Sequence, residues 1–125
     1  MSNTEQKRIL IADDEAHIAW VLQENLQTTF IDEIATAASG EEALQLFADQ
    51  PFDLLITDFM MTGMDGLTLA KEIHQLYPNT AIILLSAYSG EALRQLTDID
   101  LIQYILDKPV KLPVIRRIIS EILSQ

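Results

Sequence analysis

The chain has 125 residues, and its 19 acidic and 8 basic side chains give a formal net charge of −11 at pH 7. This length predicts a single domain, and a hydrophobic fraction of 49% is sufficient for a buried core and excludes a disordered chain. Without a membrane-length apolar run, a signal-peptide pattern or a cysteine, we expect a cytoplasmic protein with no membrane contact and no thiolate metal site.

The negative charge argues against direct binding to nucleic acid, because phosphate groups would be repelled. The charge is also unevenly distributed. Residues 1–107 contain 18 acids and 4 bases, whereas residues 108–125 contain 4 bases and 1 acid. This asymmetry raises the question of whether some of the carboxylates gather at one site.

Short apolar runs alternate with amphipathic segments along the chain. The runs are typical of strands that are covered on both faces, as in a parallel sheet. In chain order they span residues 8–12, 33–37, 54–57, 81–85 and 104–106. Apolar residues at helical spacing follow each run. In chain order the expected helices include residues 18–26, 39–47, 67–76, 91–96 and 114–123.

Several local signals define the helices further. Trp20 and Val21 are expected to widen the apolar stripe of the first helix. Ser39 and Glu42 have the spacing of a capping box at the start of the second. The apolar face of the third helix is predicted to consist of Leu67, Ala70, Ile73 and Leu76.

Five alternations of strand and helix predict an α/β fold of the (βα)5 type. Because parallel crossovers are right-handed, we expect a doubly wound, flavodoxin-like sheet of five parallel strands with helices on both faces. In such sheets, ligands bind beyond the carboxyl ends of the strands, where the strand order reverses.

Polar residues of chemical interest follow four of the predicted strands. These residues are Asp13, Asp14, Asp58, Ser86 and Lys108. Taken singly, each would most often be a helix cap, a turn residue or a surface charge. A parallel sheet brings all of these strand ends to one edge, so their coincidence favours a common site.

Three carboxylates at one edge would repel each other by about 3 kcal/mol per pair at ~5 Å and an effective dielectric constant of ~20. Oxygen ligands without His or Cys suit a hard cation such as Mg²⁺. A nearby lysine and a hydroxyl group suit a phosphoryl group. The set therefore predicts phosphoryl-transfer chemistry.

The chain resembles the receiver domain of two-component response regulators, particularly the chemotaxis type, over residues 7–123. The motifs that carry the resemblance are Ile-Leu-Ile-Ala-Asp-Asp-Glu (9–15), Ser-Gly-Glu-Glu-Ala-Leu (39–44), Asp-Leu-Leu-Ile-Thr-Asp-Phe-Met-Met (53–61), Met-Asp-Gly (64–66), Leu-Leu-Ser-Ala-Tyr (84–88) and Lys-Pro (108–109). The resemblance implies that residues 1–125 form one receiver domain with its core at 7–123.

The resemblance also assigns roles at the acidic site. Asp58 would be the phosphoacceptor, attacking a phosphohistidine and becoming an acyl phosphate. Asp14 would bind Mg²⁺ directly, Asp13 would act mainly through water, and Asp58 and the backbone carbonyl of Met60 would complete the protein ligands.

Further roles follow for residues around the phosphoryl group. Ser86 would move toward it as the switch, and Lys108 would pair with it. The Lys108–Pro109 peptide is expected to be cis. Met60 and Tyr88 each lie two residues after a site residue, and their bulk predicts a long-lived phosphorylated Asp58.

The sequence departs from the family pattern at several positions. Thr62 replaces the usual proline, which predicts a less rigid loop after Asp58. Ile105 occupies the position of the usual aromatic switch residue, and Tyr104 is expected on the opposite face of the strand.

The resemblance implies a signalling domain that is not an enzyme beyond its own autophosphorylation and autodephosphorylation. Expected partners are a sensor histidine kinase or phosphotransfer protein, a downstream effector domain or protein, and a second copy bound through the last helices. One alternative is a receiver-like binding module that is not regulated by phosphorylation. Another is a phosphohydrolase of the haloacid dehalogenase type, which also uses a strand-end aspartate and Mg²⁺.

Overall fold

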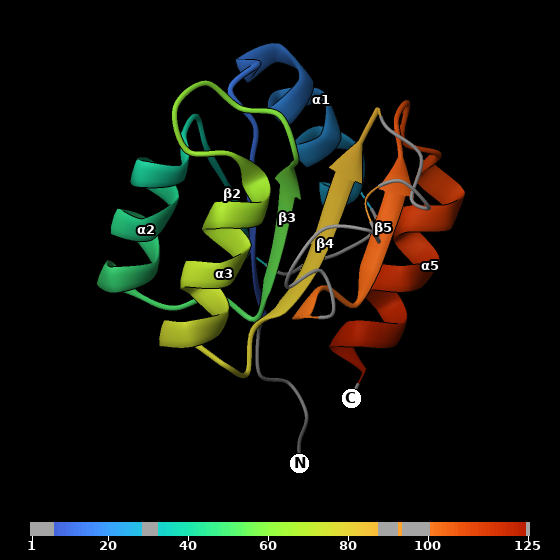
Figure 1. Ribbon diagram of the computed structural model, residues 1–125. Helices are drawn as coiled ribbons and strands as arrows, with labels where there is room; N and C mark the ends of the chain where they lie inside the picture. The colour runs from blue at the N-terminus through green and yellow to red at the C-terminus, as the bar shows by residue number, and fades with distance from the viewer. Residues whose placement is uncertain (1–6, 29–32, 88–92, 94–100, 125) are drawn as a thin grey trace.

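A computed structural model describes residues 7–28, 33–87, 93 and 101–124. Its centre is a sheet of five parallel strands in the order β2-β1-β3-β4-β5 (Figure 1). The strands are β1 (Arg8–Ala12), β2 (Glu33–Ala37), β3 (Leu54–Asp58), β4 (Ala81–Ser86) and β5 (Tyr104–Asp107). All five predicted strands are present, and the last three extend one residue further than expected.

Helices cover both faces of this sheet. The described helices are α1 (Ala16–Gln27), α2 (Gly40–Asp49), α3 (Gly66–Leu76) and α5 (Leu112–Leu123). Helices α2 and α3 pack on one face, and α1 and α5 pack on the other (Figure 1). The doubly wound α/β fold predicted from the sequence is therefore confirmed. The helix expected over 91–96 lies outside the described residues except for Leu93, which is buried.

The alternation of side chains along each strand produces two separate apolar layers. In β1, Ile9 and Ile11 point into the layer with α1 and α5, whereas Leu10 and Ala12 point into the layer with α2 and α3. All four residues are at most 1% exposed. The strand is thus apolar on both faces because both faces are covered. None of the described helices is long and apolar enough to span a bilayer.

Two side-chain caps fix the starts of α2 and α3. The Ser39 hydroxyl accepts a hydrogen bond from the Glu42 amide at 3.0 Å, and the Glu42 carboxylate accepts one from the Ala38 amide at 2.7 Å. The expected capping box is therefore present, although Glu42 reaches one residue further back than in the usual arrangement. Asp65 caps α3 by accepting from the Thr68 amide at 2.8 Å.

Two helix faces differ from prediction. Trp20 and Val21 do not widen the buried stripe of α1, because they are 55% and 39% exposed. Helix α1 packs through the narrower set Ala19, Leu22 and Leu26. In α3, Leu76 is exposed at the last turn, and Leu69 takes a core position instead. Helical spacing identified both helices. How wide a stripe of each helix is buried depends on how the helix packs on the sheet, which the spacing does not show.

An ion pair at the amino ends of β1 and β2 gives a pH-dependent contribution to stability. The Arg8 guanidinium contacts both carboxylate oxygens of Glu33 at 3.1 Å and lies 4.1 Å from the centre of the Phe52 ring. Its hydrogen bond to Glu33 lowers the pKa of that carboxyl from its ordinary value near 4.5. A lowered pKa stabilises the folded protein above the unfolded-state pKa, and this stabilisation is lost as the pH falls.

We expect Glu33→Gln to lower the free energy of unfolding by about 0.5–1 kcal/mol at neutral pH, as is typical of an exposed ion pair. The difference from wild type should shrink as the pH falls from about 4.5, because the wild-type carboxylate then becomes protonated. Urea unfolding across this pH range measures the effect. Glu24→Gln, at an exposed position of α1, makes the same charge change, and an equal loss in both variants would argue against the ion pair.

Candidate functional site

Three carboxylates meet at the carboxyl edge of the sheet. The strand order reverses between β1 and β3, which are neighbours although β2 lies between them in sequence. Asp13 and Asp14 follow β1, and Asp58 is the last residue of β3. One carboxylate oxygen from each residue can be chosen so that all three lie within 4.8 Å of one another. The topology thus brings together the acids that the sequence placed at strand ends.

Burial makes this cluster electrostatically unfavourable on its own. Asp13 and Asp58 are only 3% and 5% exposed, whereas Asp14 is more accessible. Burial raises the pKa of Asp13, and the nearby charge of Asp58 raises it further, against a lowering by the hydrogen bond from the Glu15 amide. The ionised form of Asp13 is therefore disfavoured. A donor set made only of carboxylate oxygens fits a hard divalent cation, which would offset this charge.

Lys108 contributes a cation to the same edge. Its Nζ atom lies 3.2 Å from Oδ2 of Asp58. Its backbone amide donates to the Ser86 carbonyl at 2.8 Å, which connects the exits of β4 and β5. The Lys108–Pro109 peptide is cis, as the resemblance implied.

The other predicted site residues lie around this edge. Ser86 is the last residue of β4 and is 1% exposed. Met60 follows Asp58 in the loop between β3 and α3 and is 56% exposed. Tyr88 lies outside the described residues, so the expected shielding of a phosphorylated Asp58 stays a prediction. Asp107, at the end of β5, is exposed.

Thr62 links the β3–α3 loop to Asp14. Its backbone amide and its hydroxyl both donate to Oδ2 of Asp14, at 2.8 and 2.9 Å. Both hydrogen bonds lower the pKa of Asp14, and the one from the backbone amide has the larger effect. The sequence identified Thr62 only as a departure from a proline, and neither hydrogen bond could have been inferred from that departure.

Gly66, which the sequence showed only as the last residue of the Met-Asp-Gly motif, is a structural requirement of the site. Its amide donates to the Phe59 carbonyl at 2.8 Å. A Cβ atom built on Gly66 would overlap the backbone carbonyl of Asp58. The first residue of α3 is thus packed directly against the backbone of Asp58. The Met-Asp-Gly motif was the available signal, since a cap followed by glycine can mark such a close approach.

Tyr104 and Ile105 point to opposite faces of β5, as predicted. Tyr104 packs in the layer with α1 and α5, and Ile105 packs in the layer with α2 and α3. Tyr104 therefore does not share the face of Ile105. The position usually occupied by the aromatic switch residue is filled by an aliphatic side chain.

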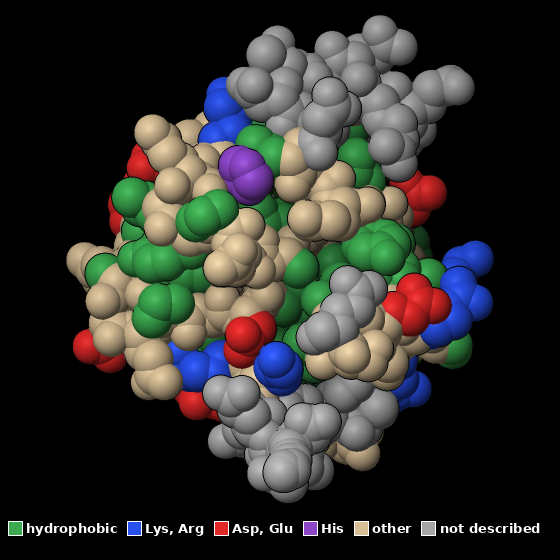
Figure 2. All heavy atoms as spheres, turned by 90° about the horizontal axis from the view of Figure 1, so that it is seen from below, with side chains coloured by type: hydrophobic (Ala, Val, Ile, Leu, Met, Phe, Trp, Pro, Cys, Tyr) green, Lys and Arg blue, Asp and Glu red, His purple; other side chains and the backbone are tan. Residues whose placement is uncertain are grey.

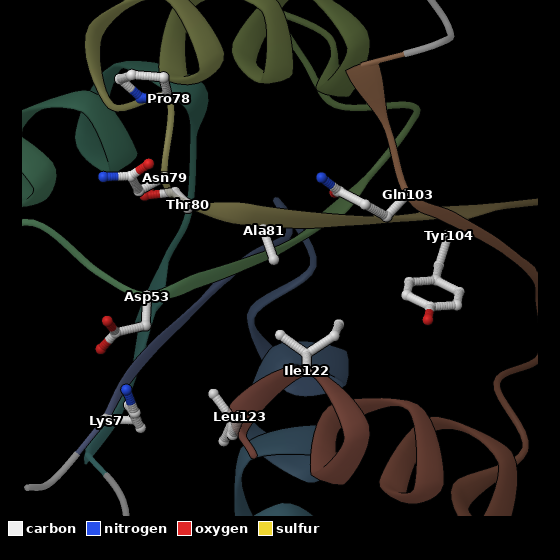
Figure 3. Close-up of a pocket in the computed structure, with 10 residues that line it drawn as sticks. All are labelled: Lys7, Asp53, Pro78, Asn79, Thr80, Ala81, Gln103, Tyr104, Ile122 and Leu123. Atoms are coloured by element: carbon white, nitrogen blue, oxygen red, sulfur yellow. The ribbon is translucent and has the colours of Figure 1, made fainter. Parts of the chain in front are cut away.

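A cavity of about 350 Å³ lies at the opposite, amino-terminal edge of the sheet (Figure 3). Three of its polar side chains form hydrogen bonds with the backbone: Asp53 accepts from the Arg8 amide, Gln103 accepts from the Ile82 amide, and Thr80 donates to the Phe52 carbonyl. Figure 2, which views the molecule from below, shows acidic, basic and apolar side chains mixed on this end. The cavity is thus separate from the carboxylate cluster.

Comparisons with known proteins identify the family. Residues 9–120 match the response regulator receiver domain. The chain is 36% identical over 81 residues to the DNA-binding transcriptional regulator NtrC of Escherichia coli K12, covering 65% of this chain but only 17% of NtrC. It is 34% identical over 98 residues to a probable chemotaxis protein CheY of Rhizobium etli, covering 76% and 75% of the two chains.

A solved structure agrees with these sequence relatives. Response regulator TrrA of Thermotoga maritima, in complex with Mg²⁺–BeF, superposes with a TM-score of 0.84 at 36% identity, covering 94% of this chain and 99% of TrrA. The family match, the sequence relatives and the shared fold all indicate the same family. The chain therefore belongs to the response regulator receiver domain family.

Proposed function

We propose that this receiver domain accepts a phosphoryl group on Asp58, with Mg²⁺ bound by the neighbouring carboxylates. The observation that carries the proposal is the arrangement around Asp58. Its carboxylate is buried, shares a cluster with Asp13 and Asp14, and has the Lys108 ammonium at 3.2 Å. This arrangement supplies a nucleophile, oxygen ligands for a cation, and a positive charge for phosphoryl oxygens.

In the proposed reaction, a carboxylate oxygen of Asp58 attacks the phosphorus atom of a phosphohistidine. The new O–P bond forms as the P–N bond breaks, so that Asp58 becomes an acyl phosphate and the histidine of the donor is released. Lys108 pairs with the incoming phosphoryl oxygens, and the Ser86 hydroxyl donates a hydrogen bond to one of them.

Asp13 and Asp14, with Asp58 and the Met60 carbonyl, would hold the cation. When bound, Mg²⁺ supplies the positive charge that allows an anionic carboxylate to approach an anionic phosphoryl group. Asp13 is the buried ligand of the pair, and Asp14 is the more accessible one.

The proposal extends to the partners. The donor is a sensor histidine kinase or a phosphotransfer protein in the cytoplasm, and the output is an effector domain or protein. Beyond its own autophosphorylation and autodephosphorylation the domain catalyses no reaction. The apolar stripe of α5 is largely used by the core, since Ile115, Ile118 and Ile119 are buried. A homodimer through the last helices would have to use the partly exposed residues beside them.

Intact-mass spectrometry after incubation with acetyl phosphate and MgCl2 tests the proposal. The wild type is expected to gain one phosphoryl group, and the gain should disappear with EDTA or in Asp58→Asn. Asp107→Asn, which neutralises an exposed aspartate at the end of β5, should still be modified. Modification of Asp58→Asn to the wild-type extent would contradict Asp58 as the acceptor.

A further inference from the structure

Thr62 connects the loop after β3 to the loop after β1, which carries Asp13 and Asp14. Its amide and its hydroxyl donate to the same oxygen, Oδ2 of Asp14, at 2.8 and 2.9 Å across a sequence separation of 48 residues. Gly63, with a φ of +82°, turns the chain immediately after it, a conformation that glycine adopts without strain. A proline at position 62 could form neither bond, since it lacks both the N–H and the hydroxyl.

These two hydrogen bonds restrict the orientation of the Asp14 carboxylate but use only one of its two oxygens. A carboxylate has two oxygens, so donors gathered on Oδ2 leave Oδ1 for a cation. Asp14 is the most accessible of the three acids, and an accessible side chain is otherwise free to turn toward water. Hydrogen bonds from outer residues commonly orient metal ligands in this way.

We propose that Thr62 is a positioning residue for Mg²⁺: its hydroxyl holds the Asp14 carboxylate in the orientation that binds the ion. The inference rests on the proposed function, because it concerns the same Mg²⁺ site. It adds a determinant of metal affinity that lies outside the residues that would bind the ion.

The test is a titration of the unphosphorylated protein with MgCl2 at constant ionic strength, followed through the backbone amide signals of Asp13 and Asp14 by NMR. Thr62→Val removes the hydroxyl but keeps the shape, the charge and the backbone amide. We expect its Mg²⁺ dissociation constant to rise roughly 3- to 10-fold, at or below the lower end of the ~10- to 100-fold range for outer supporting groups, because the amide bond remains. Thr62→Ser should retain the wild-type affinity.

Two further variants make the result decisive. Thr68→Val makes the same replacement at an exposed position of α3 and should bind Mg²⁺ like the wild type. Thr62→Ala is a second hydroxyl-free variant and should weaken binding as Thr62→Val does. Unchanged or tighter binding in both hydroxyl-free variants would overturn the role of Thr62 and leave the proposed function standing. A wild type that shows no saturable response to MgCl2 would overturn the proposed metal site, and this inference with it.

Discussion

Replacing Gly66 with alanine should destabilise the protein by about 3 kcal/mol or more, at the upper end of the usual effect of overpacking. The added Cβ would overlap the Asp58 carbonyl oxygen and would lie within 3.0 Å of Cα of Phe59. Both neighbours are backbone atoms, so the strain cannot be relieved by a side-chain rotation. For a domain of this size the loss corresponds to a melting temperature lower by roughly 10 °C.

Gly40→Ala is a matched control for this experiment. Gly40 and Gly66 are the first residues of α2 and α3, so the change in helix propensity is similar. A Cβ on Gly40 would instead meet only side-chain atoms of Met64, with the sulfur at 2.7 Å and Cβ and Cγ at 3.0 Å. Because a methionine side chain can adapt, we expect a change within about 1 kcal/mol. Thermal unfolding by circular dichroism compares the two, and equal losses would show that the contact with Asp58 is not the cause.

Removing the charge of Lys108 should lower the stability of the metal-free protein but raise its affinity for Mg²⁺. Lys108→Met leaves the buried Asp58 without the ammonium that lies 3.2 Å away. Because the Lys108 side chain is itself partly exposed, the metal-free protein should lose about 3 kcal/mol, the lower end of the range for breaking a buried ion pair. The same ammonium repels a divalent cation. At about 5 Å and the dielectric constant of water, this repulsion is roughly 1.7 kcal/mol, so the variant should bind Mg²⁺ about tenfold more tightly.

Urea unfolding without metal and calorimetric titration with MgCl2 measure the two effects. Lys111→Met changes the net charge by the same amount without removing the cation that contacts Asp58, and it should affect both quantities much less. If Lys108→Met bound Mg²⁺ no more tightly than Lys111→Met, the ammonium would not influence the metal site.

Most of the fold was predictable because its signals are local. The apolar run at 8–12 and its four counterparts became strands, and Ser39 capped α2 as its spacing indicated. The exposure of Trp20 was not predictable, since helical spacing shows which residues share a face but not how much of that face the sheet covers. The extra strand residues, including Asp58, depend on hydrogen bonding to neighbouring strands, which is a property of the assembled sheet.

The sequence was sufficient to predict which acidic residues form the site, but not the hydrogen bonds and contacts that hold them. Parallel strands place Asp13, Asp14 and Asp58 at one edge, and their clustering follows from topology alone. The bonds from Thr62 to Asp14 could not be predicted, because they depend on the path of a loop 48 residues away in sequence. The contact of Gly66 with Asp58 likewise depends on where α3 begins relative to β3.

The reversal of strand order between β1 and β3 has a consequence for the unfolded chain. Asp14 and Asp58 become neighbours only when these two strands pair, so an unfolded or partly folded chain has no high-affinity site for a divalent ion. Such an ion would bind the native state alone, and the free energy of unfolding would then rise as RT ln(1 + [Mg²⁺]/Kd). The stability of this domain would thus follow the magnesium concentration of its surroundings, even before any phosphoryl group is transferred.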